Sequence, residues 1–380
     1  MALKIMIPKE TLEGEKRVAM TPEVATRLVS QGYEVSVEAS AGHYARHADE
    51  DYVEAGAAIV SDSLKAMGEA DIVLKVQAPT IEEVSAMKEG ACVVAFMQPY
   101  QNHDLVKACA DKRLTAFSVE LIPRTSRAQA MDALSSQATV AGYKAALMAA
   151  NMTDRFLPML TTAAGTIRPA TVLVLGAGVA GLQAIATAKR LGAIVEAYDI
   201  RKAAGEQIRS LGAKFIELEI DAEAEGGYAR ELTEEEKAQE KELLNSHIAK
   251  ADIVITTAQI PGRRAPLLMP TATVELMKPG SVLIDMAAET GGNCELTRAG
   301  ESYDYNGITI FGPVNLPSTI AVHASEMYSK NLMNFLGLFS QEEGQLKIDW
   351  EDDILAGSVV THEGEVKNQS VAEAMKGGQS

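Results

Sequence analysis

Residues 171–201, TVLVLGAGVAGLQAIATAKRLGAIVEAYDIR, constrain the fold more than any other stretch of the chain. An apolar strand pattern runs into glycines spaced as G-x-G-x-x-G (Gly176, Gly178 and Gly181). An amphipathic helix pattern follows, and a second strand pattern ends in Asp199. A lone glycine triplet is a weak signal, because glycine-rich turns are common. The complete order of strand, turn, helix, strand and acid is the dinucleotide-binding fingerprint, so the stretch predicts a Rossmann unit.

Each part of this motif has a physical reason. Gly176 permits a tight turn, Gly178 lets the backbone approach a pyrophosphate, and Gly181 lets the helix pack closely on the strand. The helix start, at Val179 and Ala180, would present free N–H groups and the positive end of the helix dipole to the phosphates. The alternative is that the glycines serve packing alone.

Asp199 indicates which dinucleotide to expect. A carboxylate at this strand end accepts hydrogen bonds from both hydroxyls of the adenosine ribose and repels a 2′-phosphate. The sequence therefore predicts NAD(H) in preference to NADP(H). Arg201 and Lys202 favour the opposite choice, because cations just past the strand can hold a 2′-phosphate. We give the acid precedence because it occupies the position itself, and we include Ile200 and Arg201 in the predicted site.

The chain of 380 residues is too long for one ordinary core and contains two series of strand patterns. The first series is Lys4–Ile7, Glu34–Glu38, Asp71–Val76, Ala91–Met97 and Thr115–Val119. The second has the six strands of a complete dinucleotide fold: Thr171–Leu175, Ile194–Asp199, Lys214–Glu217, Asp252–Thr257, Ser281–Met286 and Thr309–Phe311. We predict an α/β fold of two Rossmann-like, doubly wound parallel-sheet domains joined by helices. The N-terminal domain would comprise residues 1–133 and 324–380, and the NAD(H)-binding domain residues 134–323.

Two further segments are placed to complete the site. Ala258 and Gln259 follow the strand at 252–257, where the nucleotide crevice is expected, although this segment can also be a simple turn. Residues 218–244 are dense in Glu and Lys and contain Gly226-Gly227-Tyr228. That composition is typical of a solvated loop with an exposed helix, but two glycines before an aromatic also suit a flap over the nucleotide.

The composition excludes several classes of partner. A formal net charge of −17 provides no basic field for nucleic acid and no polybasic patch for anionic lipid. The apolar run from Val172 to Leu191 contains Gln183, Lys189 and Arg190, which a lipid-facing helix would not favour. The cysteines and histidines show no metal-ligand spacing, so no metal site is expected. We expect a soluble chain that does not bind nucleic acid.

Binding NAD does not by itself name a substrate. A dehydrogenase of small hydroxy or amino acids needs a general acid/base near the nicotinamide and a cation for the substrate carboxylate. Lys75, in the strand pattern ADIVLKV, is a candidate for that cation. None of the six histidines lies at the end of a predicted strand that faces the expected cleft.

Several motifs carry a resemblance to known families. The opening IPKE…GEKRVAMTPE (7–23) is common to two of them, and PRTSRAQAMDALSSQA (123–138), TTAAGT (161–166), GGYA (226–229) and ITTAQIPG (255–262) are more specific. From about Lys4 to Phe339 the chain resembles alanine dehydrogenase. It resembles more closely the NAD(H)-binding first domain of proton-translocating nicotinamide nucleotide transhydrogenase. Alanine dehydrogenases have a catalytic His shortly after the strand that corresponds to 93–96, whereas this sequence reads Met97-Gln98-Pro99-Tyr100.

The resemblance implies roles for the loop at 123–138. Arg124 would anchor the nicotinamide carboxamide or a nearby carboxylate, and Asp132 would orient the carboxamide or the arginine. Gln129 would bridge to the ribose of the partner's nucleotide, which completes the predicted catalytic set. From the residue types alone, Arg124 and Asp132 are as readily a surface ion pair. The predicted binding set takes in further residues of the loop and flap: Arg127, Met131, Ser135, Gly227 and Tyr228.

The same resemblance implies a reaction and its partners. Hydride would pass directly, with Re/Si specificity, from NADH on this chain to NADP⁺ on a separate NADP(H)-binding domain. That reaction needs no acid/base residue. The proton path would lie in membrane-spanning transhydrogenase subunits, and this chain would dock on them as a homodimer at the cytoplasmic face of the plasma membrane. Two alternatives stay open: an NAD-dependent, alanine-type amino-acid dehydrogenase and a non-catalytic NAD sensor or scaffold.

Overall fold

The computed structural model describes residues 2–217, 233–260, 262, 264–342 and 345–377. The chain divides into two compact units. Unit 1 comprises Met1–Gln137 and Pro317–Ser380, and unit 2 comprises Ala138–Leu316. The long helix α6 (Ala133–Met152) contains the first boundary.

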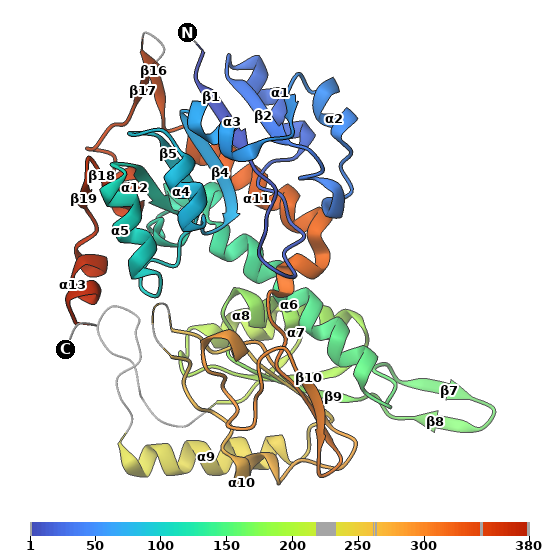
Figure 1. The fold of residues 1–380 in the computed structure, drawn as a ribbon. Helices are drawn as coiled ribbons and strands as arrows, with labels where there is room; N and C mark the ends of the chain where they lie inside the picture. The colour runs from blue at the N-terminus through green and yellow to red at the C-terminus, as the bar shows by residue number, and fades with distance from the viewer. Residues whose placement is uncertain (1, 218–232, 261, 263, 343–344, 378–380) are drawn as a thin grey trace. The chain divides into compact units, whose positions relative to one another are not determined.

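Unit 1 is built on an eight-stranded sheet with the order β19-β18-β6-β5-β4-β1-β2-β3 (Figure 1). Its strands are β1 (Lys4–Ile7), β2 (Glu34–Glu38), β3 (Ala58–Val60), β4 (Ile72–Gln77), β5 (Cys92–Phe96), β6 (Thr115–Ser118), β18 (Val359–His362) and β19 (Glu365–Val366). The strands from β1 to β6 pair in parallel, and β18 adds antiparallel to β6. Helices and short 3-10 turns connect and cover them: α1 (Pro22–Ser30), η1 (His43–Ala45), α2 (Asp49–Glu54), α3 (Ser63–Glu69), α4 (Ile81–Ala86), α5 (His103–Asp111), η2 (Val119–Leu121), η3 (Ser126–Met131), α11 (Ala321–Leu336), α12 (Asp353–Ser358) and α13 (Gln369–Gly377).

Unit 2 contains a seven-stranded sheet with the order β11-β10-β9-β12-β13-β15-β14. Its strands are β9 (Thr171–Leu175), β10 (Ile194–Tyr198), β11 (Lys214–Phe215), β12 (Ile253–Thr256), β13 (Val282–Asp285), β14 (Ser302–Tyr305) and β15 (Ile308–Phe311). Among these described strands, only β14 runs antiparallel to its neighbour. The connecting helices and 3-10 turns are α7 (Val179–Arg190), α8 (Ala204–Ser210), α9 (Glu234–Ile248), α10 (Thr271–Val274), η4 (Ala288–Thr290) and η5 (Leu316–Ile320), the last of which crosses into unit 1.

Both sheets are buried on both faces, which explains their continuous apolar strands. In β5, Cys92 and Val94 belong to one hydrophobic cluster, and Val93 and Ala95 belong to another. Residues of β9 divide in the same way between two clusters of unit 2. Alternate side chains of one strand therefore meet different layers of helices, as a doubly wound sheet requires.

Two antiparallel hairpins stand apart from the sheets. One, β7 (Leu160–Thr162) with β8 (Gly165–Ile167), projects beyond the end of α6 (Figure 1). The other pairs β16 (Ser340–Glu342) with β17 (Gln345–Lys347) in unit 1.

The predicted fold class is confirmed, since both units contain mainly parallel sheets covered by helices. All predicted strands are present, but β3, β14, β18, β19 and both hairpins were not predicted. These are short, and each lies at a sheet edge or outside the sheets, where a strand needs no long apolar run. The domain limits at residues 133 and 323 stay a prediction.

Candidate dinucleotide site

The strand order of unit 2 provides a place for a ligand. β9 lies between β10 and β12, so the chain leaves β9 toward one side of the sheet and later returns on the other. Ligands of open α/β sheets bind outside the carboxyl ends of the strands at this switch point. The segments that follow β9, β10 and β12 here are the glycine turn, Asp199 and residues 257–259.

The turn after β9 requires glycine at two positions. Gly176 has φ of +100°, and a Cβ there would lie 2.6 Å from Oγ1 of Thr257. A Cβ on Gly181 would lie 1.9 Å from the carbonyl oxygen of Gly176. Thr257 Oγ1 donates to that same carbonyl at 3.0 Å. The turn, the start of α7 and the end of β12 are therefore packed against one another without room for a side chain.

Gly178 has a different environment. It is the N-cap of α7, no described side chain caps the helix there, and a Cβ at this position would meet no described atom within 4 Å. The first N–H groups of a helix lack intrahelical partners and attract anions. The space above Gly178, Val179 and Ala180 therefore combines open volume with free donors, which is the arrangement that a pyrophosphate needs. Val179 is exposed beside it.

Asp199 follows β10 directly, and its side chain is buried, with the residue only 8% exposed. Its Oδ2 accepts a hydrogen bond from the N–H of Ala177, in the glycine turn, at 2.8 Å. Burial acts to raise the pKa of this carboxyl, but hydrogen bonds from Arg201 and from the two backbone N–H groups outweigh it and lower the pKa. The carboxylate is therefore ionised at neutral pH.

Arg201 lies on that carboxylate. Its Nε donates to Oδ1 of Asp199 and its Nη2 donates to Oδ2, both at 2.9 Å, and its backbone N–H also donates to Oδ1 at 2.9 Å. Ile200, between the two, is exposed and presents an apolar surface at the same edge. The acid and the cation that pointed to opposite nucleotides in the sequence are thus an ion pair.

The segment after β12 is held by residues that the sequence analysis did not assign. The side-chain amide of Asn293 binds both backbone groups of Ala258, and Gln259 Nε2 donates to the carbonyl of Met286 at 3.1 Å. Asp285, fully buried at the end of β13, accepts from the N–H of Asn293 at 2.8 Å. A carboxylate that ends the apolar run VLID was the available signal, because a buried acid needs donors nearby.

The loop predicted to approach the nicotinamide lies in unit 1, mostly in η3. Asp132 does not pair with Arg124. Its Oδ1 and Oδ2 accept from the N–H and the hydroxyl of Ser135 at 2.9 and 2.6 Å, and so cap the start of α6. The surface ion pair considered from the sequence is absent from these described residues. Arg124 and Gln129 are exposed, and neither side chain has a hydrogen-bond partner in the described part of the chain.

Two other residues of the predicted binding set have structural partners. Arg127 makes a bidentate ion pair with Asp352, at 2.6 and 2.9 Å, and also contacts Asp353. Hydrogen bonds from Arg127 lower the pKa of Asp352 to about 2. Met131 is 8% exposed and belongs to the main core cluster of unit 1. Contact of either residue with a nucleotide would require it to leave these partners.

The predicted flap residues Gly227 and Tyr228 lie outside the described residues.

Lys75 is not available as a substrate cation. It is 1% exposed, and its Nζ lies 2.8 Å from Oε1 of Glu83 and 3.5 Å from Oε2 of Glu10. Burial acts to lower the pKa of Lys75, but the two carboxylates raise it above its ordinary value. Gln98 occupies the turn after β5, with φ of +47°, where an alanine dehydrogenase would have its histidine. Neither required group of an amino-acid dehydrogenase is therefore in place.

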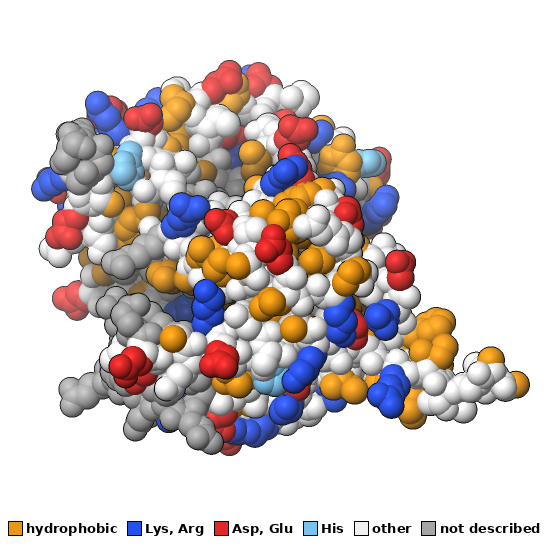
Figure 2. Space-filling view, turned by 90° about the horizontal axis from the view of Figure 1, so that it is seen from below, with side chains coloured by type: hydrophobic (Ala, Val, Ile, Leu, Met, Phe, Trp, Pro, Cys, Tyr) orange, Lys and Arg blue, Asp and Glu red, His pale blue; other side chains and the backbone are white. Residues whose placement is uncertain are grey.

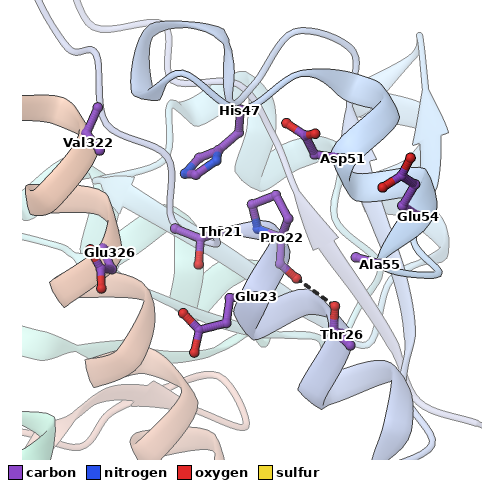
Figure 3. Close-up of a pocket in the computed structure, with 10 residues that line it drawn as sticks. All are labelled: Thr21, Pro22, Glu23, Thr26, His47, Asp51, Glu54, Ala55, Val322 and Glu326. Atoms are coloured by element: carbon purple, nitrogen blue, oxygen red, sulfur yellow. Dashed lines mark hydrogen bonds between the residues drawn. The ribbon is translucent and has the colours of Figure 1, made fainter.

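A cavity of about 500 Å³ in unit 1 lies beside α1, α2 and α11 (Figure 3). Four carboxylates line it, those of Glu23, Asp51, Glu54 and Glu326. They would repel the pyrophosphate of a dinucleotide, and no residue of the glycine turn contributes to the lining. We therefore do not place the nucleotide in this cavity.

Two further searches cover the described residues only. They contain no group of three or more His, Cys, Asp or Glu side chains that could hold a metal ion. No helix among them combines the length and apolar character needed to cross a bilayer.

Two family models match this chain. "Alanine dehydrogenase/PNT, N-terminal domain" matches residues 6–141, and "Alanine dehydrogenase/PNT, C-terminal domain" matches residues 145–369. The chain belongs to the alanine dehydrogenase/PNT family. The match includes both the glycine turn of unit 2 and the loop at 123–138 of unit 1.

Within the alanine dehydrogenase/PNT family, the chain is closer to transhydrogenase subunits. It is 46% identical over 377 residues to the first portion of NAD(P) transhydrogenase subunit alpha of Rickettsia prowazekii, a separate chain, and the match covers 98% of each chain. A crystal structure of transhydrogenase from Sinorhizobium meliloti matches with a TM-score of 0.87 and 45% identity, covering 96% of this chain and 99% of that one. An alanine dehydrogenase of Halomonas elongata is only 29% identical, over 98% of this chain and 96% of its own. The chain is thus an oxidoreductase-family member of the transhydrogenase type.

Proposed function

We propose that this chain is the NAD(H)-binding subunit of a proton-translocating transhydrogenase and passes hydride directly from NADH to NADP⁺ on a partner domain. The observation that carries the proposal is the ionised, buried Asp199 hydrogen-bonded to the glycine turn. It suits the two ribose hydroxyls of NADH and repels the 2′-phosphate of NADPH.

The reaction between two nicotinamides also suits the groups that the chain offers. Hydride transfer between rings moves no O–H or N–H proton, so it requires close contact and exclusion of water rather than an acid/base residue. Arg124 and Gln129, without partners in the described residues, can then bind the nicotinamide carboxamide of NADH and the nucleotide of the partner. Asp132 and Ser135 hold the start of α6 beside them and can orient the same carboxamide.

The partners follow from the same proposal. NADP(H) is held by a separate domain, and the proton path lies in membrane-spanning subunits that this chain joins at the cytoplasmic face of the plasma membrane. Support comes from the name of the relative of Rickettsia prowazekii, which designates it as the first portion of a subunit alpha and so implies an assembly of several chains.

A homodimer is the expected state of the subunit, and the β7–β8 hairpin is the surface we assign to it. Figure 2 shows hydrophobic side chains at the base and tip of this projecting arm. Phe156, Met159 and Ile167 are exposed there, at 54%, 63% and 47%. An arm with so little core of its own is stabilised by packing on a second copy. Replacing Met159 and Ile167 with Ser should shift the chain to monomers in analytical ultracentrifugation; unchanged dimers would refute this surface.

The decisive test combines the purified chain with a purified NADP(H)-binding transhydrogenase domain. With NADH and thio-NADP⁺, whose reduced form absorbs at a distinct wavelength, we expect formation of reduced thio-NADP. The control supplies the chain alone with NAD⁺ and alanine and follows NADH. Steady NADH formation would establish an amino-acid dehydrogenase instead. NADH binding without either activity, in the presence of a folded partner, would establish a sensor.

A further inference from the structure

The hydrogen bonds of Asp199 account for the whole acceptor capacity of its carboxylate. Oδ1 accepts from the backbone N–H and the Nε of Arg201, and Oδ2 accepts from the N–H of Ala177 and the Nη2 of Arg201. A carboxylate offers about four lone-pair positions. Two backbone donors and two guanidinium donors therefore leave no acceptor position for the adenosine ribose.

Only the guanidinium can give way. The N–H groups of Ala177 and Arg201 are fixed by the turns after β9 and β10, whereas the side chain of Arg201 is 47% exposed and projects from a loop. Two ribose hydroxyls need two acceptor positions, and Nε and Nη2 of Arg201 occupy two. The guanidinium thus lies where the 2′- and 3′-hydroxyls would donate, and ribose binding must move it from Asp199.

We propose, on the basis of the proposed NAD(H) site, that Arg201 is a second determinant of nucleotide choice. Its guanidinium is able to bind a 2′-phosphate, and Asp199 prevents this by holding it in an ion pair and by repelling the phosphate. The selectivity then belongs to the pair and not to the acid alone. Removing the charge of Asp199 releases a cation beside the 2′ position.

The chemistry of the guanidinium supports this role. Its planar donors match a phosphate in bidentate geometry, and such charge-assisted hydrogen bonds are among the stronger ones in proteins. Arg201 is joined to Asp199 through neighbouring residues on one turn, so it needs only a side-chain rotation to reach a group attached at the 2′ oxygen.

The test measures displacement of NADH from the full chain by ADP and by 2′,5′-ADP, which differ in where the second phosphate is attached, for wild type and variants. Direct dissociation constants for NADH and NADPH complete the set. Asp199→Asn should raise the affinity for the 2′-phosphorylated ligands relative to their counterparts by about ten- to hundredfold. Asp199→Asn combined with Arg201→Gln should lose that gain. Asp199→Asn combined with Lys202→Gln removes the same charge one residue away and should retain it.

Arg201→Gln alone should still reject NADPH, because Asp199 remains. Asp199→Ser serves as a second background in case the amide of Asn disturbs the turn, and thermal melting verifies the fold of each variant. The proposal is overturned if the gain survives Arg201→Gln, if Lys202→Gln abolishes it equally, or if neither folded Asp199 variant gains affinity. Wild-type preference for NADH over NADPH is a separate result, and its absence would instead refute the NAD(H) site.

Discussion

Asn293 binds both backbone groups of Ala258: its Oδ1 accepts from the N–H at 3.1 Å, and its Nδ2 donates to the carbonyl at 2.8 Å. The same Nδ2 donates to the carbonyl of Pro266 at 2.8 Å. One fully buried side chain therefore fixes the segment after β12 that faces the glycine turn.

We expect Asn293→Ala to weaken NADH binding and to lower the free energy of unfolding. The substitution leaves buried backbone groups of Ala258 unsatisfied, which costs about 1–3 kcal/mol. Chemical denaturation and NADH titration measure the two effects. Asn245→Ala is the control, because the side chain of Asn245 accepts from Thr273 and lies on α9. Equal NADH affinity in both variants would contradict the role given to Asn293.

The two neighbouring glycines Gly181 and Gly178 should respond oppositely to alanine. At Gly181 the new Cβ would lie 1.9 Å from a backbone oxygen, so α7 must move and the protein should lose about 1–3 kcal/mol or more of stability. At Gly178 the Cβ meets no described atom, so the melting temperature should change little while NADH affinity falls, because the methyl group occupies space meant for the pyrophosphate. A Gly178→Ala variant that binds NADH normally would show that the phosphates lie elsewhere.

The sequence predicted the fold where a local pattern carries the global rule. Apolar strands followed by helical segments are sufficient to indicate parallel sheets, and β9 and β12 were assigned within a residue or two. It did not predict β18, because the strand Val359–His362 exists by pairing antiparallel to β6, more than two hundred residues earlier in the chain. Such pairing depends on tertiary contact, which no local periodicity reports.

The site was predictable to the extent that a backbone requirement fixes the residue. Gly176 and Gly181 are required by positive φ and by close packing, which a spacing rule captures. The ion pair between Asp199 and Arg201 was not predictable, because two residues on one turn can point together or apart. The burial of Met131 and the pairing of Arg127 with Asp352 likewise depend on segments distant in sequence.

The buried pair of Glu15 and Arg17 predicts a pH dependence of stability. Burial acts to raise the pKa of Glu15, but hydrogen bonds and the charge of Arg17, at 2.6 Å, lower it to about 2 from 4.5. A depressed pKa in the folded state contributes stability that is present above pH 4.5 and is lost as the pH falls toward 2. Glu15→Gln should therefore cost about 3 kcal/mol at pH 7 and progressively less on acidification. Urea denaturation at several pH values measures this, and a pH-independent difference would contradict it.

Gln129 should act on hydride transfer rather than on NADH binding. Its side chain is exposed and without a hydrogen-bond partner in the described residues, so Gln129→Asn should leave folding and the dissociation constant of NADH nearly unchanged. Shortening the side chain withdraws its amide from the partner's nucleotide, and the rate of reduction of thio-NADP⁺ should fall at least about tenfold, the effect of one lost hydrogen bond in the transition state. Gln101→Asn, also exposed in unit 1, is the matched control and should behave as wild type. A large loss of NADH affinity with an unchanged transfer rate would assign Gln129 to the binding of this chain's own nucleotide instead.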